Sequence, residues 1–140
     1  MALGEAVPRR KLMPLCEQIG RANVALVVHD FYQRLQLDEM MRPFFAGMGD
    51  FTEHEALIAD FWWTVMGGKI DQAHEFDMLG RHRALNLNGA ALQRWLQIFK
   101  ATLLTHLPPE LAQRWLQMAL GIADVMRRNL QLGDASCASI

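Results

Sequence analysis

The sequence predicts a single all-α domain, and three observations support this prediction. First, the chain has 140 residues, which suits one domain with a sizeable core. Second, apolar residues recur with the 3.6-residue period of a helix, and no segment alternates with the two-residue period of a strand. Third, glycine and proline residues divide the helical pattern into about five helices, of which three are long.

The first long helix is expected from about residue 20 to residue 36, where the apolar side chains form one stripe. That stripe consists of Val24, Val27, Val28, Phe31 and Leu35. Pro43 and the FFAGMGD segment then interrupt the helical pattern. Before this break, Asp38 is expected to cap a short turn that runs through Met41.

The second long helix is expected to begin near Thr52, with Thr52 or Asp50 as its cap, and to end at Gly67-Gly68. Its predicted apolar face consists of His54, Leu57, Ile58, Phe61 and Val65. The segment 69–88 is less regular, and we expect a loop there followed by a short helix. That short helix would carry Phe76, Leu79 and His82.

Two more helices are predicted after this segment. Asn88 is expected to cap the first, and Pro108-Pro109 to begin the second, because proline is tolerated in a first turn. The stripe of the first consists of Leu92, Trp95, Leu96, Phe99 and Leu103. The inward residues of the last helix are expected to be Leu111, Trp115, Met118, Ile122, Val125 and Met126, before Gly133 stops it.

Composition and charge argue against several classes of function. The net charge of −1 gives no basic surface to attract nucleic acid. Although 51% of the residues are apolar, no apolar run approaches the ~20 residues needed to cross a membrane. The early basic residues are not followed by the apolar core of a secretory leader. Cys16 and Cys137 lie near opposite ends of the chain, so we expect no structural disulfide and a cytoplasmic location.

Two histidines are candidates for a site, and each has an ordinary alternative. His54 heads an otherwise apolar helical face, and it could simply mark the solvent edge of that face. His82 lies in the segment MLGRHRAL and could be a surface histidine in a basic loop. Alternatively, His82 is an iron ligand of haem, with Leu79 and Leu85 at the edge of the cofactor. Arg81 could then pair with a haem propionate.

Two further polar-tipped residues could join such a site. Tyr32 is the only tyrosine of the chain, and Trp95 follows His82 by thirteen positions. Each of them, taken alone, is also explained by core packing. Other site chemistries fail: His54 and His74 each precede a glutamate, but neither has the second histidine of a zinc HExxH helix. The chain also contains no CxxC pair.

Taken together, these segments resemble the truncated haemoglobins, the two-over-two helical branch of the globins, over roughly residues 20–130. The segment DFYQRL is similar to the second helix of that family, and PFFAGM to the turn that sets a phenylalanine against the haem. EHEALIADFW is similar to the helix over the distal side, where the gas binds. These matches imply Tyr32 as a distal residue, Phe45 against the haem, His54 and Ile58 over the iron, and Phe61 and Trp62 near the ring.

The segment GRHRALNLNGAALQRWLQIF resembles the proximal histidine of the family, the loop after it and the helix that carries its tryptophan. The resemblance implies haem b (iron protoporphyrin IX) with His82 as the axial ligand. It also implies Trp95 as a distal hydrogen-bond donor and Phe99 as a further cofactor contact. His74 is a rival ligand, but it lies 21 residues before Trp95, which is too long for the family pattern.

The resemblance divides between two groups of the family. The Gly67-Gly68 pair, the Arg81-His82 dipeptide and the thirteen-residue spacing are similar to the second group. The distal histidine, and the lack of that group's Tyr-Ser and Gly-His-Pro segment, favour the third group. The chain is expected to divide into an N-terminal extension or short helix over 1–19, a truncated globin domain over 20–132 and a flexible tail over 133–140.

The function that the resemblance implies is reversible binding of oxygen, nitric oxide or carbon monoxide at ferrous iron. Tyr32, His54 and Trp95 would slow the release of the gas, which suits chemistry or sensing better than oxygen transport. One alternative is redox catalysis with a reductase, either oxidation of nitric oxide or reduction of peroxide. Another is that His54 itself binds the iron. A third alternative, from a different class, is a haem-free helical interaction module.

Overall fold

The computed structural model describes residues 13–70 and 88–129, and all regular structure within these two ranges is helical. The predicted all-α class is therefore confirmed. The helices are α2 (Leu15–Ile19), α3 (Arg21–Leu37), the 3₁₀-helix η1 (Arg42–Phe45), α4 (Thr52–Val65), α6 (Gly89–His106) and α7 (Pro109–Asn129). None of the described helices is both long enough and apolar enough to span a membrane.

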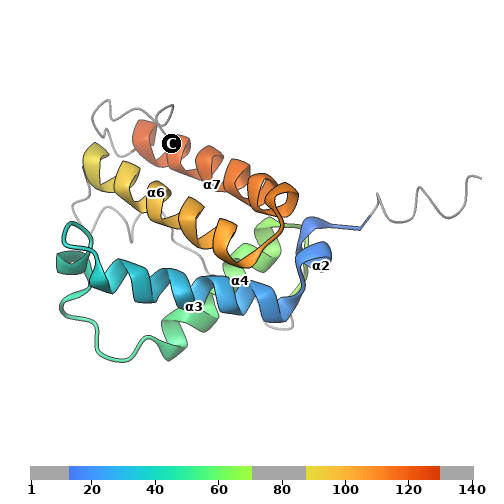
Figure 1. The fold of residues 1–140 in the computed structure, drawn as a ribbon, viewed down its shortest axis with the longest axis horizontal. Coiled ribbons are helices and arrows are strands. Elements are labelled where there is room, and N and C mark those ends of the chain that lie inside the picture. Colours follow the sequence, from blue (N-terminus) through green and yellow to red (C-terminus); the bar gives the residue numbers. More distant parts are fainter. Residues whose placement is uncertain (1–12, 71–87, 130–140) are drawn as a thin grey trace, which may run out of the picture.

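The helices form two layers of two (Figure 1). One layer pairs α3 with α4, the other pairs α6 with α7, and the layers meet where α3 packs against α6. The short helix α2 packs against α3, α4 and α7 at one end of the molecule. Cys16 in α2 is buried and free of any disulfide, while Cys137 lies outside the described residues.

Local sequence signals set the limits of most helices. The predicted stripe of α3 is buried throughout, and the helix begins and ends one residue later than predicted. Asp38 accepts hydrogen bonds from the backbone N–H groups of Met40 and Met41, so the predicted capped turn is confirmed. Asn88 likewise accepts the backbone N–H of Ala91 at 2.8 Å and caps α6 as predicted.

The predicted ends of α4 are also confirmed. Both the backbone N–H and the hydroxyl of Thr52 donate to Asp50, at 3.0 and 2.8 Å, so the carboxylate holds the first residue of the helix. After Val65 the chain turns at Gly67, whose φ of +100° lies in the left-handed region that favours glycine. A Cβ on Gly67 would also lie only 2.9 Å from the Cβ of Pro14, so a second constraint keeps this position small.

α7 begins at Pro109 as predicted, and its buried face agrees in part with the prediction, since Trp115 and Met126 are buried. The fully buried residues are Ala112, Trp115, Ala119, Ala123 and Met126. Leu111, Met118 and Ile122 are only half-buried, and Val125 is 36% exposed, so its inward placement was wrong. The three alanines occupy the contact because small side chains let neighbouring helices approach closely, and a search for large apolar residues overlooks them. Gly133 lies outside the described residues.

Candidate functional site

The centre of the candidate site is a hydrogen-bonded pair that joins α3 to α4. The hydroxyl of Tyr32 lies 2.9 Å from Nε2 of His54, and the two rings are perpendicular with centroids 5.1 Å apart. Tyr32 is only 7% exposed, and His54, in the first turn of α4, is half-buried. The structure therefore brings together two of the three predicted distal residues, which lie 22 positions apart in the sequence.

Two phenylalanines enclose the ring of Tyr32. Phe45, at the end of η1, meets it edge to face at 5.8 Å, and Phe51 lies at 5.9 Å. The two phenylalanine rings are themselves 6.1 Å apart. Phe45 was predicted from the family resemblance, whereas Phe51 was missed because it precedes the helix and belongs to no periodic stripe.

The surroundings of Tyr32 keep its hydroxyl protonated. Burial raises the pKa of Tyr32 well above its ordinary value, and the nearby carboxylate of Glu55 raises it further. The hydroxyl is therefore a neutral group that can donate a hydrogen bond at any physiological pH. When Nε2 of His54 carries no proton, the tyrosine donates to it; in the other tautomer the tyrosine accepts.

The third predicted distal residue, Trp95, reaches this pair through another ring. Trp95 is half-buried on α6, and Phe31 meets it edge to face at 5.0 Å. Phe31 also contacts the ring of Tyr32, with centroids 5.7 Å apart, so it lies between the two predicted donors. Trp95 stacks on Phe99 at 5.2 Å with an interplanar angle of 22°. Among these residues, sequence analysis assigned Phe31 only to the core.

The buried face of α4 differs from the predicted one, and this correction bears on the site. The fully buried residues of the helix are Ala59 and Trp62, whereas Ile58, Phe61 and Val65 are half-buried. Trp62 is the cause, because this large ring turns toward α6 and α7. It stacks on Phe99 at 5.5 Å and meets Trp115 edge to face at 5.8 Å. The predicted core stripe therefore lies on the flank of the core.

This flank has the composition that a haem site requires. His54, Ile58, Phe61 and Val65 share one face of α4, because their spacing returns to the same side of a helix. Three half-buried apolar side chains therefore follow the residue that pairs with a buried hydroxyl. A flat apolar cofactor needs such a face, and a polar gas bound to it needs such donors. The residues present thus fit haem.

The predicted proximal residues lie outside the described residues. They are His82, Leu79, Arg81 and Leu85, together with the rival ligand His74. Among residues 13–70 and 88–129, no three His, Cys, Asp or Glu side chains are grouped as they would be to hold a metal ion. Haem iron needs no such group, because the porphyrin supplies four ligands and a single imidazole can supply the fifth.

Comparison with known families agrees with the fold. The family model described as bacterial-like globin matches residues 14–127, which include every described helix except the last two residues of α7. The chain belongs to the bacterial-like globin family. Membership in these globins confirms the predicted globin-like fold, and it is consistent with the truncated haemoglobins. A search of curated proteins found no relative that matches.

The matched range of this bacterial-like globin contains every residue predicted for the site. Globins normally hold haem, so the family supports the general expectation of a haem-binding, gas-binding protein. Tyr32 and His54 are joined in the structure, Trp95 is linked to them by Phe31, and Phe45 packs against Tyr32. Trp62 and Phe99 lie deeper in the core, stacked on each other, and their predicted contact with a cofactor stays a prediction.

Proposed function

We propose that this bacterial-like globin binds haem b and reversibly binds a diatomic gas, with oxygen as the first candidate and nitric oxide and carbon monoxide as others. The observation that carries the proposal is the hydrogen bond between buried Tyr32 and half-buried His54 beside a half-buried apolar flank. The distal histidine favours the third group of truncated haemoglobins.

The proposed roles of the remaining residues follow from their chemistry. His82 is proposed as the axial ligand and Arg81 as the partner of a propionate, while Leu79 and Leu85 would lie at the edge of the cofactor. On the other side, Ile58 and the residues along its face would exclude water from the ring. When bound, haem would supply ferrous iron with one open position for the gas.

The distal residues would slow the release of the gas. The hydroxyl of Tyr32 keeps its proton, the indole N–H of Trp95 can only donate, and His54 can donate in one tautomer. A hydrogen bond contributes about 1–1.5 kcal/mol, so two of them would slow release by roughly 30- to 150-fold. Such slow release suits chemistry or sensing better than transport.

An absorption spectrum of the purified protein tests this proposal. The reduced protein should show an intense haem band that shifts when carbon monoxide is added. His82→Ala should lose the cofactor or hold it much more weakly, whereas His74→Ala should retain it. A folded, helical protein without haem would favour the interaction module instead. If only His74→Ala loses haem, the axial ligand is His74 and not His82. A six-coordinate reduced spectrum would show that His54 binds the iron in competition with the gas.

A further inference from the structure

The contact between α3 and α4 contains three polar side-chain pairs along antiparallel helices. Arg21 pairs with Asp60 at 2.7 Å at one end. His29 then pairs with Glu55, with Nδ1 and Oε1 2.9 Å apart, and the hydroxyl–imidazole pair described above follows at 2.9 Å. The second and third pairs are neighbours, because their members are three residues apart on α3 and adjacent in sequence on α4.

We propose that Glu55, held by His29, is a positioning residue for the neighbouring pair. It fixes the first turn of α4 against α3 so that the Tyr32 hydroxyl meets the His54 imidazole. The effect on the pair itself needs no cofactor. The effect on gas release rests on the proposed function.

Burial and hydrogen bonding place Glu55 between solvent and the pair. The side chain of Glu55 is 17% exposed, whereas that of His29 is 58% exposed. Outside them lies a groove of about 490 Å³ that both residues line together with Phe51. The backbone N–H of Glu55 donates to the carbonyl of Phe51 at 2.7 Å. A displaced Glu55 would therefore move the turn that carries His54 and the ring that packs on Tyr32.

Two residues of α4 act on the Tyr32 hydroxyl. His54 is hydrogen-bonded to it, and Glu55, which is paired with His29 of α3, acts on it through its charge. Burial is the larger cause of the raised pKa of Tyr32, and the charge of Glu55 adds to it. Because burial alone already keeps the phenol protonated, the role proposed for Glu55 rests on its position and not on the protonation of Tyr32.

The single tyrosine of the chain makes the proposal directly measurable. Tyrosine labelled with ¹³C at Cζ gives one NMR signal, from Tyr32, whose position responds to the hydrogen bond of the hydroxyl. The full-length protein as purified would be compared with Glu55→Gln, which removes the charge but keeps the length, and with Glu55→Ala. Glu53→Gln and Glu53→Ala are matched controls, because Glu53 is an exposed acid in the same first turn.

We expect both Glu55 variants to shift the Tyr32 signal and to release oxygen faster, by roughly two- to tenfold for one weakened hydrogen bond. The Glu53 variants should match the unmodified protein in both measurements. A Tyr32 signal that stays in place in folded Glu55→Ala and Glu55→Gln would overturn the proposal. If the signal shifts but the protein holds no haem, the positioning role stands and the proposed function fails.

Discussion

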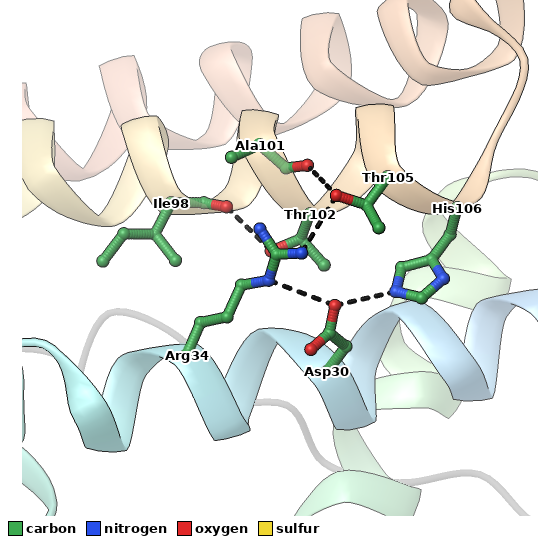
Figure 2. A network of polar contacts seen from close by, with 7 residues as sticks. All are labelled: Asp30, Arg34, Ile98, Ala101, Thr102, Thr105 and His106. Atoms are coloured by element: carbon green, nitrogen blue, oxygen red, sulfur yellow. Dashed lines mark hydrogen bonds and ion pairs between the residues drawn. The ribbon is translucent and has the colours of Figure 1, made fainter.

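Helix α3 makes two contacts that are built differently. Against α6 its partly exposed edge carries a connected network, drawn in Figure 2. Asp30 accepts from Arg34 at 3.1 Å and from Nε2 of His106 at 2.7 Å, and Arg34 also donates to the hydroxyl of Thr105 at 2.9 Å. Against α4, by contrast, three polar pairs follow one another along the contact, and the innermost joins buried Tyr32 to half-buried His54.

The far end of the α3–α6 contact is closed by a second charged group. Asp38 receives two hydrogen bonds from Arg94, at 2.9 and 2.6 Å, on the same oxygen. Between the two charged groups lies the aromatic contact of Phe31 with Trp95 and Phe99. Charged groups at both ends and rings in the middle fix this contact, whereas the α3–α4 contact places a part-buried hydroxyl–imidazole pair between its helices. The first contact is therefore expected to contribute more to the stability of the fold, and the second carries the candidate site.

The largest loss of stability should come from removing an aromatic ring in the middle of the α3–α6 contact. Phe31 is 2% exposed, and Phe31→Ala should lower the free energy of unfolding by about 3–5 kcal/mol, because it leaves a cavity among three rings. The same change removes the ring between Tyr32 and Trp95. Leu37→Ala on the same helix is the control, since Leu37 is 80% exposed and should cost less than about 0.5 kcal/mol. Denaturant unfolding followed by circular dichroism measures both, and a small loss in Phe31→Ala would contradict the architectural role.

The second prediction concerns the loss of a charged group at one end of the same contact. Asp38→Ala should cost about 2 kcal/mol, because Arg94 loses a charged partner and the turn N–H groups of Met40 and Met41 lose their acceptor. Asp124→Ala, at an exposed acid paired within α7 only, should cost much less. Equal losses in the two variants would show that Asp38 is an ordinary surface charge.

Acid should weaken the α3–α6 contact as well. Burial alone would raise the pKa of Asp30, but the hydrogen bond from His106 and the charge of Arg34 outweigh it and hold that pKa below its ordinary value. The hydrogen bond from Arg94 similarly lowers the pKa of Asp38. Because the unfolded value is about 3.9, this stabilisation is complete above roughly pH 5 and is lost as the pH falls through the lower folded-state values. Asp30→Asn with Asp38→Asn should therefore flatten the loss of stability in acid, and an unchanged acid slope would contradict this account.

Sequence analysis succeeded where the determining chemistry is local. Asn88 and Pro109 begin their helices because a side-chain cap and a missing N–H act within one turn, and both starts were predicted. The prediction of the buried face of α4 failed for a physical reason. Periodicity finds an apolar stripe, but the adjacent stripe with Trp62 is the one that faces the core, and that choice depends on packing against other helices.

The candidate site divides in the same way. The meeting of Tyr32 with His54 was expected from the family resemblance and not from the residues alone, because nothing local joins positions so far apart. The pair of His29 with Glu55 was missed, since each residue by itself resembles ordinary helix surface. Only the antiparallel contact of the two helices brings these side chains together.

A change at the buried pair should have a moderate effect on stability and a clear effect on function. Tyr32→Phe removes the hydroxyl and leaves Nε2 of His54 without this partner, which should cost about 1 kcal/mol of stability. Under the proposed function, oxygen should dissociate roughly tenfold faster, as expected for one lost hydrogen bond. Stopped-flow measurement of oxygen release gives the rate. An unchanged rate would remove Tyr32 from the distal network even if the haem is retained.

The smallest effect should come from the outer end of the α3–α4 contact. Arg21 is 47% exposed, pairs with Asp60, and lies over the ring of Trp63 at 4.8 Å. Arg21→Gln should lower the free energy of unfolding by less than about 1 kcal/mol, because exposed ion pairs and cation–π contacts are weak in water. It should leave the NMR signal of Tyr32 unchanged, since the lost pair lies more than two turns away along α3. A shifted tyrosine signal would mean that the α3–α4 contact responds as one unit, and the positioning of the site could then not be assigned to Glu55 alone.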